Sequence, residues 1–284
     1  QHEQHPQVLA SSIVTAVRVA AAGCSVSCWL TREAAFLRRV SSRWLAVLVF
    51  ILGLANSAGA RAGDGGLPVP FVSGAVEGWS GADAIRHSWS AYSGVNWSPF
   101  GKIAADGLRV RLSGGYGEYR YPGSVGGRTE TVYGTAGFAD LLVGYQLGLG
   151  ALTLKAFGGA TFDGHVLAPF DGNNPVNANA TGAKGVVEGW LNITPATWAQ
   201  VDLAYGTAHA SYNSRLRVGH RVANGLSLGV EGGGFGNAAS DNGRLGGFAR
   251  YDWLGGEVSV SGGMSGDIAA PRNPYGTLVY LMKF

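Results

Sequence analysis

Short runs in which apolar and polar residues alternate follow one another along the chain from Leu67 onward. In the run 107–119, leucine and valine occupy positions 108, 110 and 112, while arginine and serine occupy positions 109, 111 and 113. Successive side chains of a strand point to opposite faces, so this period of two predicts strands with one apolar and one polar face. No segment after Leu67 sustains an apolar period of 3.6 residues. The pattern predicts an all-β chain.

Twelve such runs can be counted, and glycine or proline marks many of the turns between them. An even number of antiparallel strands, with tight turns alternating with longer connections, is typical of a single transmembrane β-barrel. The longest connection is expected at 163–182. The connection 99–107 is an exception, because it is long on the side where turns should be short. The expected strands cover 69–79, 87–98, 107–119, 131–146, 151–162, 183–192, 197–207, 212–222, 225–235, 243–253, 256–264 and 275–284.

The last run, 275–284, alternates up to a terminal phenylalanine, with Tyr280, Met282 and Phe284 on one face. An apolar face of this kind suits contact with outer-membrane lipid. The ending is also similar to the signal that the barrel-assembly machinery of Gram-negative bacteria reads. This resemblance implies that the three residues form an assembly signal, that the assembly machinery is a partner, and that the protein lies in the outer membrane.

The other end of the chain resembles a secretory signal. Three arginines, Arg38, Arg39 and Arg43, precede an apolar run at 44–55, and small residues follow at 58–60. The run is shorter than the roughly 20 residues that a spanning helix needs. We therefore expect a signal peptide at 33–60 that is cleaved, an upstream extension at 1–32 outside the mature protein, and a barrel at 61–284.

Charge and cysteine usage change meaning once this leader is set aside. Five of the 21 basic residues and two of the 18 acidic ones precede Arg61, which leaves sixteen of each. A neutral mature chain favours no nucleic-acid partner. Both cysteines, Cys24 and Cys28, also precede the expected cleavage. No disulfide and no thiolate metal site are therefore predicted for the barrel, and no other metal site or cofactor is assigned.

One pair of residues has the spacing of a hydrolase. His209 and Ser211 would share a strand face, as the histidine and serine of outer-membrane phospholipase A do. Only Asn213 or Asn224 could orient the histidine, and the rest of that family's pattern is absent. A lipid hydrolase is therefore the least favoured function, and no catalytic residue is assigned.

Charged residues at positions expected to face the lumen are the main functional signal. Arginines alone would line an anion-selective pore. Acidic residues on neighbouring strands favour a second interpretation, in which cross-strand ion pairs fill and stiffen a small lumen. The candidates are Arg109, Arg111, Arg215, Arg217, Arg221 and Arg250, with Glu77, Glu188, Asp202, Glu231 and Asp252.

The segment 94–121 resembles the cellulose biosynthesis protein BcsS family of alphaproteobacteria. The matching features are Trp97-Ser98-Pro99-Phe100-Gly101, Asp106-Gly107, the pair Arg109 and Arg111, and Tyr116-Gly117-Glu118-Tyr119-Arg120-Tyr121. Further similar motifs lie at 141–146, 188–190 and 215–219, so the resemblance extends from about residue 70 to the end. It also covers the long connection at 99–107.

This resemblance implies a non-enzymatic outer-membrane component that accompanies a bacterial cellulose synthase. Cellulose or synthase components would then be partners, and the barrel would help to export, anchor or organise the glucan at the cell surface. A small oligosaccharide or anion channel is the alternative. Aromatic residues near strand ends would contact sugar rings or the membrane interface. They are Trp97, Tyr116, Tyr119, Tyr121 and Trp190, and Trp79 and Trp198 are further expected interface residues.

Overall fold

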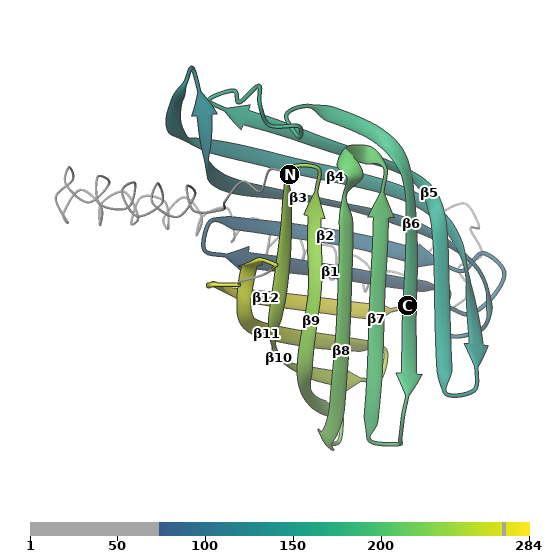
Figure 1. Ribbon diagram of the computed structural model, residues 1–284. Coiled ribbons are helices and arrows are strands. Elements are labelled where there is room, and N and C mark those ends of the chain that lie inside the picture. The colour runs from purple at the N-terminus through teal and green to yellow at the C-terminus, as the bar shows by residue number, and fades with distance from the viewer. Residues whose placement is uncertain (1–73, 269–270) are drawn as a thin grey trace, which may run out of the picture. The chain divides into compact units, whose positions relative to one another are not determined.

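A computed structural model describes residues 74–268 and 271–284, which form a closed antiparallel barrel of twelve strands. Each strand pairs with the next along the chain, and β1 pairs with β12 to close the sheet (Figure 1). The prediction of a single all-β barrel is confirmed. The expected extension 1–32 and signal 33–60 lie outside the described residues, and so do residues 61–73 of the expected barrel segment.

The strands have the following bounds, and one 3-10 turn, η1, covers Ala208–Ala210. They are β1 (Val76–Ile85), β2 (Ser88–Trp97), β3 (Gly107–Val125), β4 (Arg128–Leu149), β5 (Leu152–Ala168), β6 (Asn179–Asn192), β7 (Thr197–Gly206), β8 (Tyr212–Ala223), β9 (Leu226–Asn237), β10 (Ser240–Trp253), β11 (Gly256–Asp267) and β12 (Asn273–Lys283).

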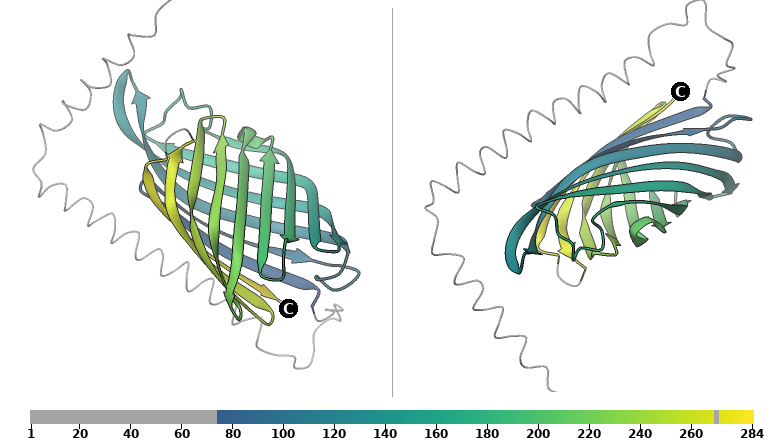
Figure 2. Two further views of the ribbon diagram at one scale, coloured as in Figure 1. Left: turned by 60° about the horizontal axis from the view of Figure 1, so that its bottom comes forward. Right: turned by 90° about the horizontal axis from the view of Figure 1, so that it is seen from above.

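The strand boundaries differ from the predicted ones mainly at one rim of the barrel, where the β3–β4 and β5–β6 hairpins turn. β3 and β4 continue to a two-residue turn at Gly126 and Gly127, both with positive φ, and their hairpin reaches beyond the neighbouring strands (Figure 2). The outer part of this hairpin is polar on both faces, because it lies beyond the apolar band of the barrel. Its sequence therefore lacks the alternation from which strands are predicted. β5 and β6 are also longer, so the connection expected at 163–182 covers only 169–178.

The two faces of the sheet separate as the alternation predicts. On β4, Leu141 and Val143 are 57% and 52% exposed on the outer face, while Leu142 between them is 1% exposed inside. On β12, Tyr280 and Met282 share the outward side with Leu278, which is 47% exposed, and Phe284 follows the strand at the next outward position. Within the described residues, no helix is long and apolar enough to cross a membrane.

Seven inward aromatic rings lie against the barrel wall, and each is opposite a glycine on the neighbouring strand. A Cβ atom placed on any of these glycines would overlap the ring. Glycine therefore supplies the space that lets a large side chain occupy a narrow lumen. We call these the aromatic–glycine pairs: Trp79 with Gly94, Tyr92 with Gly81, Tyr119 with Gly134, Phe138 with Gly115, Phe157 with Gly144, Trp198 with Gly219, and Phe248 with Gly229.

Gly219→Ala is expected to lower the free energy of unfolding by about 1–3 kcal/mol, the usual cost of overpacking. The new methyl group would meet the Trp198 ring, which is fully buried. Urea unfolding in lipid vesicles, followed by tryptophan fluorescence, measures the change. Gly158→Ala is the matched control, because nothing lies within 4 Å of its added Cβ atom. Equal stability of the two variants would contradict the role given to the pair.

The first strand begins and the last strand ends at the same rim, where Glu77 of β1 pairs with Lys283 of β12. The short turns after β4, β6, β8 and β10 also lie at this rim. The hairpins β3–β4 and β5–β6 and the ten-residue connection 169–178 extend at the opposite rim, and outer-membrane barrels carry such extensions on the extracellular side, so we take the rim of the short turns as the periplasmic one. The long connection 98–106 also lies there, as the sequence predicts. Arg109, 1% exposed, donates to Ser98 Oγ at 3.0 Å and to the Ile103 carbonyl at 3.1 Å.

Candidate functional site

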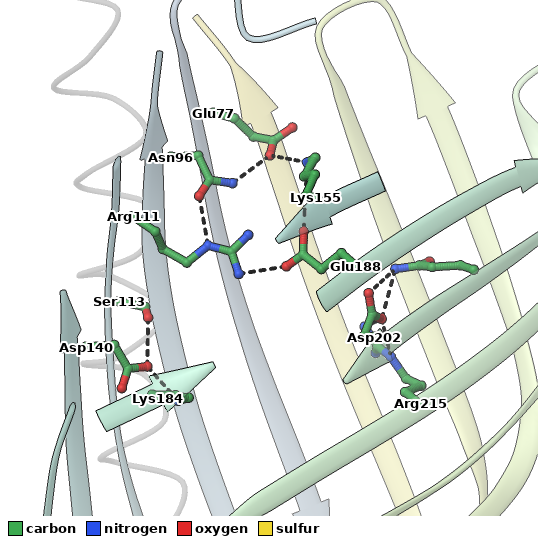
Figure 3. A network of polar contacts seen from close by, with 11 residues as sticks. Glu77, Asn96, Arg111, Ser113, Asp140, Lys155, Lys184, Glu188, Asp202 and Arg215 are labelled. Carbon is green, nitrogen blue, oxygen red and sulfur yellow. Dashed lines mark hydrogen bonds and ion pairs between the residues drawn. The ribbon is translucent and has the colours of Figure 1, made fainter. Parts of the chain in front are cut away.

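A closed ring of polar contacts crosses the lumen near the periplasmic rim (Figure 3). Asn96 donates to Glu77 at 3.1 Å and accepts from Arg111 at 2.8 Å. Arg111 Nη1 lies 2.7 Å from Glu188, and Lys155 Nζ lies 3.9 Å from Glu188 and 3.4 Å from Glu77. We call these five residues the polar ring. It joins β1, β2 and β3 to β5 and β6, so it ties together strands that are not neighbours in the sheet.

A second set of contacts fills the lumen along β8 to β12. Arg217 Nε donates to Glu231 at 2.7 Å, and the Tyr275 hydroxyl donates to the other carboxylate oxygen at 2.8 Å. The Glu231 side chain is fully buried and that of Arg217 is 4% exposed. Arg217 also reaches Ser259 and Ser261 on β11, each at 3.4 Å. Burial of both charges makes this pair sensitive to the loss of either partner.

Aromatic rings pack against a third arginine. Trp190 and Trp198 stack with centroids 4.3 Å apart, and Phe248 lies 5.4 Å from Trp198. The Arg250 guanidinium lies over both tryptophans, 4.5 Å from the Trp190 centroid, and pairs with Asp252 and Glu257. Since two strands separate β10 from β7 and three separate it from β6, this contact joins strands that are not neighbours in the sheet.

A cavity of about 220 Å³ remains inside the barrel above the polar ring. On β1, β3 and β6 its wall lies one inward position farther from the periplasm than the ring residues. Trp79, for example, follows Glu77 on the same face. The lining side chains include Trp79, Tyr92, Arg111, Ser113, Phe138, Asp140, Leu142, Lys184, Val186, Asp202 and Ala204.

Polar and aromatic residues also meet at the outer rim. The Tyr119 hydroxyl lies 2.9 Å from His165 Nδ1, and His165 Nε2 lies 3.1 Å from Asp163. Tyr121 donates to Asp171 at 3.1 Å and accepts from Asn174 at 2.7 Å, which fixes the connection 169–178 against β3. These contacts stabilise the mouth of the barrel.

The structure brings most of the candidate charges together, some across the neighbouring strands that the sequence indicates and others with partners that the sequence did not specify. Asp202 pairs with Arg215 at 3.2 Å, as neighbouring strands allow. Arg109 contacts the connection 98–106 in place of a carboxylate. Arg221 is exposed and differs from its expected place in the lumen: it donates to the Pro195 carbonyl at 2.7 Å, beside a register shift at the end of β8.

The aromatic candidates divide between the two faces. Trp97 and Tyr116 face outward and are 44% and 46% exposed. Tyr119, Tyr121 and Trp190 differ from the interface position considered for them, because their rings lie inside the barrel and bond or stack there. Trp79 and Trp198 likewise lie inside. The inward parity of odd positions on β3, already visible at Arg109 and Arg111, is the signal that could have placed the two tyrosines.

Several lumen residues were not singled out from the sequence. Asp140, 3% exposed, accepts from Ser113, Thr161 and Lys184. Lys155 completes the polar ring, and Arg244 pairs with Asp83 across β10 and β1 at 3.1 Å. Each is a single charge in an otherwise apolar or glycine-rich run, so alternation alone does not mark it as a candidate lumen residue.

The hydrolase spacing does not form a dyad in the part of the chain that the structure describes. His209 lies in η1 with φ of 51°, and its Nε2 contacts the Ala178 carbonyl at 3.0 Å. No hydrogen bond joins it to Ser211 among the described residues. Nor do three metal-binding side chains gather anywhere within 74–268 and 271–284.

A profile of the family described as cellulose biosynthesis protein BcsS matches residues 78–284, which is nearly the whole barrel. The chain belongs to this family. The match confirms the resemblance seen in the segment 94–121 and connects the barrel with bacterial cellulose biosynthesis. No curated protein matches the chain.

Solved structures with a similar fold include the KdgM porin, at 10% identity and a TM-score of 0.42, where the match covers 73% of this chain and 99% of that one. The translocator domain of the autotransporter NalP from Neisseria meningitidis has 11% identity and a TM-score of 0.43, covering 92% and 100%. A TodX mutant, a monoaromatic hydrocarbon channel, has 8% identity and a TM-score of 0.45, covering 75% and 92%.

The location of this BcsS-family barrel follows from its own surface. A closed barrel has no unpaired strand edge and satisfies its backbone hydrogen bonds internally, as a bilayer requires. Its outward residues are apolar, with Leu141, Val143 and Leu278 among the exposed ones. The protein is an outer-membrane β-barrel of a Gram-negative bacterium.

Proposed function

We propose that this BcsS-family barrel is a non-conducting and non-enzymatic accessory of cellulose biosynthesis, which anchors or organises the glucan at the cell surface. The observation that supports a closed barrel is the polar ring, whose contacts connect β1–β3 with β5–β6 across the lumen. A pore needs a continuous water-filled path, whereas these contacts bridge part of the cross-section that the path would use.

The filled lumen also bears on the channel alternative. Basic and acidic side chains in the lumen form ion pairs with each other, such as Arg217 with Glu231 and Arg215 with Asp202. An arginine surplus that would select anions is therefore lacking along these described strands. Assembly through the barrel-assembly machinery, and contacts with synthase components, belong to the same proposal.

In-frame deletion of the gene is expected to lower the glucan retained on the cell surface and to raise soluble glucan in the medium. An anchor holds what has already been exported, so the periplasm should gain none. Cellulase-sensitive glucan in the three fractions provides the measurement. The intact gene should restore retention. Glucan accumulating in the periplasm would overturn the proposal in favour of export through the barrel.

The purified barrel in a planar bilayer is expected to show no conductance steps above the lipid background. The native barrel should be compared with the Arg215→Glu and Arg217→Glu variants, each prepared in the same way. Steady conductance that either substitution abolishes would support the anion channel and contradict a closed lumen.

A further inference from the structure

We propose that the lumen cavity binds one sugar ring at the end of a neutral β-glucan chain. This inference rests on the proposed function, and it identifies the place where an anchoring barrel would hold its polymer. The cavity of about 220 Å³ is smaller than the roughly 300–1,000 Å³ of sites for drug-sized ligands. It therefore suits a single ring, and the polar ring lies directly on its periplasmic side.

The walls carry the apolar surface that a sugar ring requires. Trp79, Tyr92 and Phe138 border the cavity, and each belongs to an aromatic–glycine pair. Because the glycines let these rings lie against the sheet, the rings line the cavity without crossing it. Aromatic surface of this kind packs against the C–H groups of a pyranose.

Hydrogen-bonding groups also remain available at the cavity. Arg111 uses Nε and Nη1 for Asn96 and Glu188, while its Nη2 has no hydrogen bond within the described residues. Lys184 Nζ donates to Asp140 at 2.7 Å and lies 5.2 Å from the Phe138 ring centroid; it has no second hydrogen-bond acceptor among the described residues, which leaves ammonium protons for a ligand. The Tyr92 hydroxyl is likewise without a hydrogen bond in the described part of the chain. Such donors match sugar hydroxyl oxygens.

The charges around the cavity favour a neutral ligand. Arg111 is balanced by Glu188, Lys184 by Asp140, and Arg215 by Asp202. An anion would compete with carboxylates that already hold these cations, whereas a hydroxyl group can add to a paired ion without displacing its partner. A neutral hexose is thus favoured over an acidic sugar.

Ala204→Leu provides the test, because this small residue lines the cavity and a larger side chain would fill it. The full barrel in lipid nanodiscs should bind cellohexaose, measured by calorimetry, and the variant should lose at least tenfold in affinity. Ala139→Leu, the same change on the lipid-facing side of β4, should leave the affinity unchanged. Tyr92→Phe removes one hydroxyl and should weaken binding about fivefold.

The outcomes separate this inference from the proposed function. Absence of cellohexaose binding, equal affinity of Ala204→Leu and the native barrel, or tighter binding of an acidic hexasaccharide would each overturn the inference. If deletion lowers surface glucan but Ala204→Leu, assembled at normal levels, does not, the function stands and the site is wrong. If binding depends on the cavity but deletion changes no glucan fraction, the site stands and the function fails.

Discussion

Replacing Glu231 by glutamine is expected to lower the free energy of unfolding by about 3–5 kcal/mol, the cost of breaking a buried ion pair. The substitution keeps the shape of the side chain but leaves the Arg217 charge without its carboxylate. The Arg217 charge cannot reach solvent, because its side chain is 4% exposed and its other contacts are serine hydroxyls at 3.4 Å and the Phe248 ring. Tyr275 would also lose a charged acceptor.

Urea unfolding of the barrel in lipid vesicles, at a pH near 7, measures this loss. Glu130→Gln is the matched control, because Glu130 is an exposed residue of the β3–β4 hairpin and surface substitutions usually change stability by less than about 0.5 kcal/mol. A Glu231→Gln barrel as stable as the control would show that the lumen pair contributes little.

Arg109→Met is expected to release the periplasmic connection 98–106 and to lower the free energy of unfolding by at least about 2 kcal/mol. Methionine keeps an apolar stem but removes the donors that reach Ser98, Ile103, Ala105 and Leu108. Hydrogen bonds to a charged group contribute roughly 1.5–3 kcal/mol each, and the buried carbonyls would lose their partner.

Limited trypsin digestion reports on the connection itself. Lys102 lies at its exposed surface, and the variant should be cleaved there at least tenfold faster, since local opening exposes the backbone. Arg128→Met, at the exposed tip of the β3–β4 hairpin, should leave the rate at Lys102 unchanged. An unchanged rate in Arg109→Met would mean that other contacts, such as Ile103 N to the Gly74 carbonyl, hold the connection.

The number of strands, and which side chains point into the lumen or outward, could be predicted because both follow from local alternation. The residues of β7 show this: Gln200 and Asp202 face inward and Leu203 faces outward, as their order in the sequence indicates. The outer ends of β3 to β6 could not be predicted, since a polar strand outside the membrane carries no alternation. There the glycine turn and the cross-strand hydrogen bonds decide the boundary.

The partners inside the lumen were less accessible from the sequence. Neighbouring strands suggest the pair of Asp202 with Arg215, because their register is local. The contacts of Lys155 with Glu77 and of Arg244 with Asp83 connect strands that are not neighbours in the sheet. They depend on the curvature of the closed barrel and on how far each side chain reaches across it, neither of which alternation describes.

The placement of the aromatic–glycine pairs has a consequence for how the barrel forms. All seven join strands that are consecutive in the chain, so each ring finds its glycine within a single hairpin. The register between β1 and β12 contains no such pair among the described residues. Contacts between neighbours in sequence carry a small loop-closure entropy and form early. We therefore expect the hairpins to set their registers independently, and the seam between β1 and β12 to close last and slowest.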